Sequence, residues 1–269
     1  MPIEIRHLQT LVEVWRRKEE PETADLQRAL HVAQALENDA ASPTHMKAFA
    51  WHLAVESHRA VGWELPSDVS LASCRAAAVS VSHAASLLIA EIEGQVHGAD
   101  SPVLVLGALA ACRSIFGRWD LLPASGALLI PLAREERGLP SASDLPTTRG
   151  IHWAAPGRLQ MIYEEHAFPV SLNGEKVLVP RPELVAARTS SKVLQPDTPE
   201  AFVFCGAALT AATDGQWADV MRISKALGHD SAPLELAMHF GIDQRLDLGI
   251  GRTRRSFFSF RRILGRTSK

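Results

Sequence analysis

The sequence predicts an α+β protein with an N-terminal helical bundle, a small mixed sheet in the middle and further helices at the C-terminus. Apolar residues recur at three-to-four spacing up to residue 96 and again after residue 182, which is the period of amphipathic helices. Between these sections lie short apolar runs bounded by glycine and proline, which are typical of strands. Because the strands are confined to one section, a doubly wound sheet is not favoured.

Residues 1–98 form the predicted all-helical region. Four helices are expected, over 3–19, 24–36, 45–61 and 67–96. The last is rich in alanine and serine, whose small side chains let helices approach one another closely. Its outer face could bind a second copy of the chain or another protein partner, and burial inside the monomer explains the composition equally well.

Residues 99–190 form the predicted α/β core, which begins after the breaker cluster Gly98–Pro102. The pair Asn173-Gly174 stands between two apolar runs and is the strongest short-range hairpin signal in the chain. In order, we expect a strand at 103–106, a helix at 108–116, a strand at 119–122, a helix from 125 to about 137, a strand at 159–163 and hairpin strands at 170–172 and 176–179.

Residues 191–269 form the predicted C-terminal helical region, which ends in a basic tail. The helical period returns after Pro182, first over 183–188. Longer helices are expected over 199–212, 216–227 and 231–240.

Composition bounds the class of protein. The chain has 269 residues, 46% of them hydrophobic and 22% charged, with a formal net charge of −2. This balance is that of an ordinary globular protein, with no global attraction to nucleic acid or membranes. Three widely spaced cysteines favour buried thiols in a reducing compartment. Because we find neither a signal peptide nor an apolar run long enough to span a bilayer, we expect no transmembrane segment and a cytoplasmic location.

Common catalytic motifs are missing from the sequence. There is no GxGxxG, GxxxxGK[ST] or GxSxG, so dinucleotide, P-loop and hydrolase sites are not indicated. The eleven histidines do not occur at the i,i+4 spacing of a helical zinc site.

One stretch carries a family resemblance. Residues 102–123 read PVLVLGALAACRSIFGRWDLLP, an apolar strand, a small pair Gly107-Ala108, a helix, then Arg118 and Asp120. Together with the hairpin and the Pro-Glu-Leu helix that follow it, this stretch resembles the nucleotidyltransferase (polymerase-β-like) fold of the abortive-infection toxin type, over roughly residues 102–245. The resemblance implies a central sheet of nucleotidyltransferase type and a nucleotide site that includes Gly107, Ala108, Arg118 and Arg188.

The resemblance also implies a catalytic metal, and the sequence departs from the family there. Members hold Mg²⁺ with two or three carboxylates, which orient the nucleoside triphosphate. Asp120 occupies the first acidic position, but Leu122 occupies the second, and a hydrocarbon cannot coordinate Mg²⁺. Only Glu164 and Glu165 could supply a further ligand. We therefore expect a degenerate nucleotidyltransferase that binds nucleotide or nucleic acid, and an active enzyme using Asp120 with Glu164 or Glu165 is the alternative.

The C-terminal tail is the strongest non-catalytic signal. From residue 252 to 269 it holds seven basic residues, no acidic residue and several aromatic ones. Arginine with aromatic side chains suits phosphate contact and base stacking, so DNA or RNA binding through this tail is a second hypothesis. An anionic membrane surface, a protein partner and a docked C-terminal helix remain open. The residues expected to contact nucleic acid are Arg252, Arg254, Arg255, Phe258, Arg261, Arg262 and Arg266.

Overall fold

The computed structural model describes residues 5–16, 21–99, 101–132, 150–193, 195, 197–213 and 216–243. It confirms the α+β class, with one five-stranded mixed sheet in the described residues and helices on both sides of it in the chain. The helices are α1 (Ile5–Arg16), α2 (Thr23–Asn38), α3 (Thr44–Ala60), α4 (Ala72–Val96), α5 (Ala108–Phe116), α6 (Gln160–Glu165), α7 (Pro182–Ser190), α8 (Pro199–Thr213), α9 (Trp217–Leu227) and α10 (Ala232–His239). The strands are β1 (Val103–Leu106), β2 (Ala127–Pro131), β3 (Ile151–Trp153), β4 (Ala167–Leu172) and β5 (Glu175–Pro180).

The sheet has the strand order β3-β2-β1-β5-β4. β1 is at its centre, antiparallel to β2 and parallel to β5. The β4–β5 hairpin confirms the signal at Asn173-Gly174, because both residues adopt the positive φ angles, 49° and 105°, that a two-residue hairpin turn requires.

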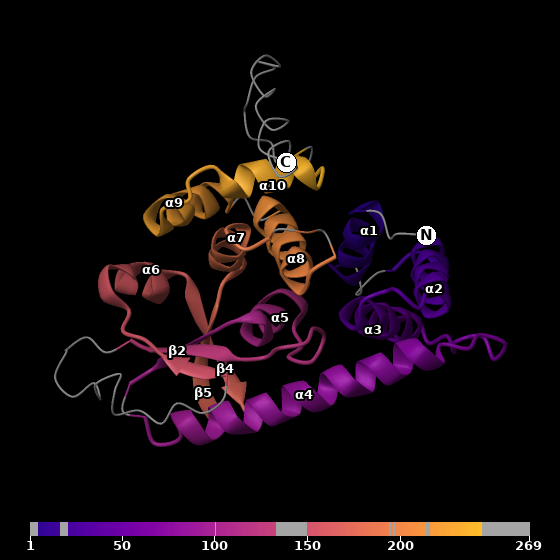
Figure 1. The fold of residues 1–269 in the computed structure, drawn as a ribbon, viewed down its shortest axis with the longest axis horizontal. Helices are drawn as coiled ribbons and strands as arrows, with labels where there is room; N and C mark the ends of the chain where they lie inside the picture. The colour runs from indigo at the N-terminus through magenta and orange to yellow at the C-terminus, as the bar shows by residue number, and fades with distance from the viewer. Residues whose placement is uncertain are drawn as a thin grey trace, which may run out of the picture.

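The two faces of the sheet are covered by different helices (Figure 1). Side chains alternate along β1, so Val103 and Val105 face α4 while Leu104 and Leu106 face the core beneath α7 and α8. The larger of these cores contains side chains from α1 to α10. Trp15, Phe49, Phe116 and Phe202 meet in it with ring centroids 5.1–6.2 Å apart. This packing ties the N-terminal helices to α5 and α8.

The long helix α4 covers one face of the sheet. Among the described residues it alone is long and apolar enough to cross a membrane. Core helices of folded proteins can have the same length and composition, so these two properties do not by themselves indicate a membrane span. Cys74, Ala78, Ala85 and Leu88 are buried along one side of α4, so this helix is packed against the rest of the fold.

Three of the secondary-structure predictions for the central section are wrong. Residues 119–122 form a bend rather than a strand, although Leu121 and Leu122 are fully buried. Residues 127–131, expected to be helical, form β2, because the Leu-Leu-Ile run is hydrogen-bonded on both edges by neighbouring strands. Residues 160–165 are helical instead of extended. In and beside that segment the less exposed residues are Leu159, Gln160, Ile162, Tyr163 and His166, and all of these except Gln160 recur at a helical spacing.

Candidate ligand-binding site

The floor of the candidate site is bare backbone from three chain segments. Gly107 follows β1 with φ of 127° and precedes the first turn of α5. Gly126 precedes β2 and Gly150 precedes β3. A Cβ atom on Gly126 would lie 2.1 Å from the carbonyl oxygen of Gly150, and one on Gly150 would lie 2.4 Å from the carbonyl oxygen of Ser125. A side chain at Gly126 or Gly150 is therefore sterically excluded, and these two segments pack backbone to backbone beneath the cavity.

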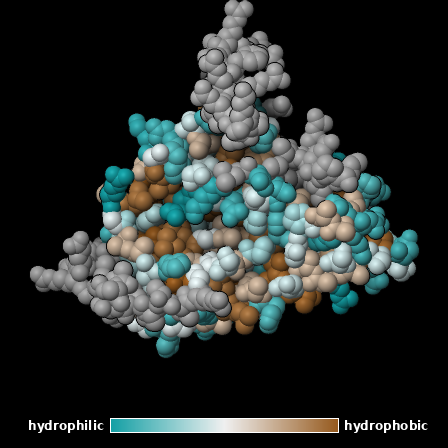
Figure 2. Space-filling model, viewed as in Figure 1, coloured by the Kyte–Doolittle hydropathy of each residue, from teal (hydrophilic) through white to brown (hydrophobic). Residues whose placement is uncertain are grey.

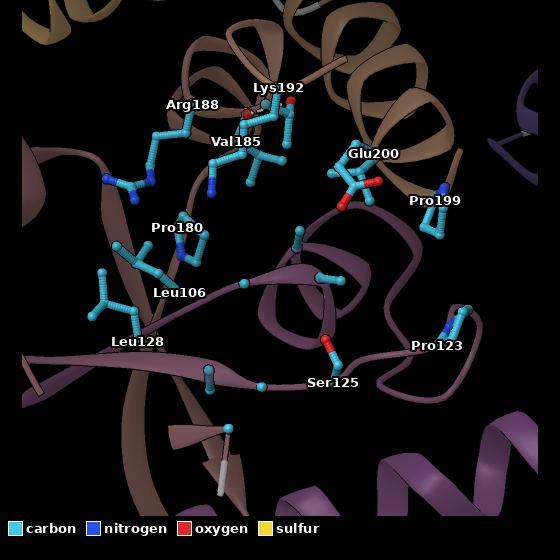
Figure 3. A pocket seen from close by; sticks show the side chains of 18 of the residues that line it. Leu106, Pro123, Ser125, Leu128, Pro180, Val185, Arg188, Lys192, Pro199 and Glu200 are labelled. Carbon is cyan, nitrogen blue, oxygen red and sulfur yellow. Dashed lines mark hydrogen bonds between the residues drawn. The ribbon is translucent and has the colours of Figure 1, made fainter. Parts of the chain in front are cut away.

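A cavity of about 770 Å³ lies above this floor, at the carboxyl end of β1. Its other walls come from α7, from the first turn of α8 and from the segment before β2 (Figure 3). The N-terminus of α5 opens into it, so the unpaired backbone N–H groups of that turn add partial positive charge. The volume is in the usual range for small-molecule sites.

Two cations line the cavity, one on α7 and one just after it. Arg188 lies in the last turn of α7 and Lys192 lies two residues past the end of that helix, and Figure 3 shows both side chains at the same wall of the cavity. Arg188 donates a hydrogen bond from Nη1 to the hydroxyl of Tyr163 at 2.9 Å, and its guanidinium carbon lies 6.0 Å from the centre of that ring. Among the residues described, neither cation forms an ion pair. Among the described lining residues, the single carboxylate is Glu200, at the start of α8.

The structure brings together three of the four residues expected to bind nucleotide. Gly107, Ala108 and Arg188 all line the cavity. Arg118 does not line it, and neither does Asp120. Their elements meet α3 and α4 instead, so the first acidic position of the expected catalytic set is not in the cavity.

Asp120 is held in a network of its own. It accepts two hydrogen bonds from Arg118 at 3.0 Å each and one from the hydroxyl of Ser82 at 2.8 Å. Arg118 also reaches Glu56 of α3, at 3.4 Å. Burial alone would raise the pKa of Asp120, but the hydrogen bonds from Arg118 and Ser82 and the Arg118 charge outweigh it and leave the pKa below 3.8. These contacts fasten the bend after α5 to α3 and α4.

A buried histidine adjoins this network. His52 of α3 is 9% exposed, and its Nε2 atom has no hydrogen-bond partner among the described residues. Burial and the nearby charge of Arg118 lower the pKa of His52 from 6.5 to about 4, against the opposing effect of Asp120. The imidazole is therefore neutral at physiological pH.

Glu164 and Glu165 are not in the cavity either. Glu164 accepts a hydrogen bond from Gln160, and Glu165 pairs with Arg222 of α9 at 3.1 Å. Across the described ranges, no three His, Cys, Asp or Glu side chains are grouped as a metal ion would require. The carboxylates thus do not fit Mg²⁺ held as in the nucleotidyltransferase family, whereas the cations and the glycine floor fit a phosphate group.

Several residues near or in the site carried no recognised signal in the sequence. Lys192 lies two residues after the end of α7, so no helical spacing links it to Arg188 in the sequence. The roles of Gly126 and Gly150 depend on segments far apart in the chain, so no local pattern marks them. Glu183, in the first turn of α7, is 1% exposed and accepts a hydrogen bond from Nδ1 of His166 at 2.8 Å, which anchors α7 to the junction between α6 and β4.

The expected nucleic-acid contacts from Arg252 to Arg266 lie outside the described residues. Comparison of the chain with models of protein families, with curated proteins and with solved structures finds no match. The fold class and the geometry of the cavity are therefore the observations from which a function is argued.

Proposed function

We propose that this protein is a nucleotidyltransferase-like protein that no longer performs metal-dependent transfer, and that it binds the phosphates of a nucleotide in the cavity between α5 and α7. The observation that carries the proposal is the pair Arg188 and Lys192, two cations without an ion-pair partner among the described residues, facing a glycine floor.

Phosphate is the ligand chemistry that suits these groups. A guanidinium matches phosphate oxygens with two parallel donors, and an ammonium supplies a mobile point charge. Backbone N–H groups at the start of α5 can donate to the same anion, since Gly107 and Ala108 line the cavity. Glu200, on the other side of the cavity, is suited to accept hydrogen bonds from a sugar hydroxyl or a base amino group.

In the part of the chain that the structure describes, no carboxylate pair lies in the cavity, which supports a binding role over catalysis. Strand β2, which is paired with β1, has the sequence Ala-Leu-Leu-Ile-Pro and contains no acidic residue. Asp120 already accepts hydrogen bonds from Arg118 and Ser82, so recruiting it to a metal would break those contacts.

Nucleotide titration tests the proposal. ATP, CTP and GTP should each be tried with and without Mg²⁺, by thermal shift and by isothermal titration calorimetry. We expect at least one to bind and to raise the Tm, with little dependence on Mg²⁺, since a ligand at a hundred times its Kd stabilises the fold by about 2.7 kcal/mol.

Matched variants locate the binding site. Arg188→Met and Lys192→Met should each weaken binding by about ten- to a hundredfold, because each removes a charge-assisted hydrogen bond of about 1.5–3 kcal/mol. The controls Arg158→Met and Lys176→Met remove exposed cations that do not line the cavity, and should leave affinity unchanged. The proposal fails if no nucleotide binds. Product formation that requires Mg²⁺ and Asp120 would instead establish the active enzyme.

A further inference from the structure

The outward face of α4 is a strip of small and apolar side chains, interrupted only by Ser80, His83 and Ser86, on the surface of the fold. Between Arg75 and Glu91 the helix has no Asp, Glu, Lys or Arg, a length of more than four turns. Val79 and Leu87 are 64% and 60% exposed on this face. The other exposed large apolar residues among those described, Trp63, Met161 and Met238, lie singly on different elements. Figure 2 shows hydrophobic surface along the lower edge of the molecule, where α4 runs in Figure 1.

We propose that this face binds the same face of a second copy of the chain, with the two α4 helices antiparallel. The inference does not depend on the proposed nucleotide site, because none of the cavity-lining residues belongs to α4.

Charge complementarity selects this partner and this orientation. Arg75 and Glu93 are five turns apart at about 3.6 residues a turn, so both lie along the same flank of α4. In an antiparallel pair, Arg75 of each copy comes opposite Glu93 of the other, twice in the dimer. In a parallel two-fold pair this flank would instead face the opposite flank of the partner helix, so Arg75 and Glu93 would not meet. Arg75 has no ion-pair partner within the described part of the chain, and Glu93 uses one oxygen for Asn173, which leaves the other for a cation.

Shape is also complementary in this arrangement. A two-fold axis beside His83 places Val79 of one copy against Ser86 and Ala90 of the other, on one flank of the contact. On the opposite flank it places Leu87 against Ala76 and Ser80. Each large side chain thus meets small ones, which permits the close approach of ridges into grooves. This pairing removes both exposed apolar side chains from water.

The size of the contact predicts a weak dimer. A 25-residue helix is about 37 Å long, so two such strips bury on the order of 1,000 Å² in total, near the lower limit of specific interfaces. We therefore expect dimerisation that depends on concentration, with a Kd in about the micromolar range.

Sedimentation velocity over two decades of protein concentration tests this inference. The wild-type chain should pass from monomer to dimer, Leu87→Glu should remain monomeric, and the control Met161→Glu, at a residue 80% exposed on α6, should dimerise as wild type. Arg75→Glu should weaken dimerisation by at least about tenfold through like-charge opposition, and adding Glu93→Arg should restore it.

Disulfide trapping gives a second readout that does not depend on a charged substitution. The native cysteines Cys74, Cys112 and Cys205 are buried, so they do not interfere. His83→Cys lies beside the two-fold axis and should form a covalent dimer under mild oxidation, whereas Ala24→Cys, exposed on α2, should not. A wild-type chain that stays monomeric at every concentration overturns the proposal. So do equal cross-linking of both variants and co-sedimentation of a monomer with lipid vesicles.

Discussion

Acid should destabilise this protein through His52. Burial and the Arg118 charge hold the pKa of His52 at about 4, against 6.5 for an ordinary histidine. The unfolded chain therefore binds a proton between these values that the folded chain does not. Because the folded-state pKa is lowered, the stability associated with His52 is fully present above about pH 6.5 and is lost as pH falls toward 4.

The magnitude follows from the two pKa values. At pH 5 the unfolded histidine is almost fully protonated while the folded one is almost fully neutral, which costs about 2 kcal/mol of unfolding free energy, and the full difference at lower pH is roughly 3 kcal/mol. Burial also lowers the pKa of His45, so that residue adds a loss in the same direction. Asp120 contributes only at lower pH, because its pKa lies below 3.8.

Urea denaturation followed by tryptophan fluorescence measures this effect. Between about pH 7.5 and pH 5, wild-type protein should lose about 2 kcal/mol more than His52→Leu, since the variant keeps every other titrating group. The control His31→Leu removes an exposed histidine and should retain the wild-type pH dependence. Equal losses in the wild type and His52→Leu would refute the argument that His52 is buried and neutral.

Three further predictions follow from the contacts. Gly126→Ala should lower the free energy of unfolding by about 2 kcal/mol or more in urea denaturation, because the new Cβ would meet the carbonyl oxygen of Gly150, whereas Gly94→Ala, with nothing within 4 Å, should not destabilise the chain. Asp120→Ala should lower the unfolding free energy by about 2 kcal/mol through loss of the hydrogen bonds from Arg118 and Ser82, and calorimetry should find nucleotide affinity unchanged; a large loss of affinity with normal stability would contradict the separation of Asp120 from the cavity. Truncation after Gly251 should weaken the binding of DNA or RNA and flatten its salt dependence in fluorescence anisotropy, if the basic tail makes the phosphate contacts, and an unchanged affinity would remove that hypothesis.

Outside the central section, periodicity predicted the helices well because most of them have one apolar face. The spans of α1, α2, α3 and α5 agree with the structure within a few residues, and so does the hairpin, whose Asn-Gly turn is a strictly local signal. Strand β2 could not be predicted in this way. Its consecutive apolar residues are compatible with a helix or a buried strand, and the pairing that decides between them involves β1 and β3, which are distant in the sequence.

The candidate site was predictable only in part. Gly107 and Arg188 stand out as a strand-end glycine and a cation after the hairpin, and both line the cavity. The position of Asp120 was not predictable, because the bend that carries it is fixed by Ser82 and Glu56 through contacts of long sequence separation. Lys192 was overlooked since a lone exposed lysine carries no signal until the cavity beside it is known.

The most direct test of the central claim is a calorimetric titration of the wild-type protein and of Arg188→Met/Lys192→Met with the nucleotide that gives the largest thermal shift, in the absence of Mg²⁺. The account predicts saturable binding at one site per chain in the wild type and the loss of most of that affinity in the double variant, with Arg158→Met/Lys176→Met binding as the wild type does. Wild-type affinity in the Arg188→Met/Lys192→Met protein, or no binding by the wild type, would contradict it.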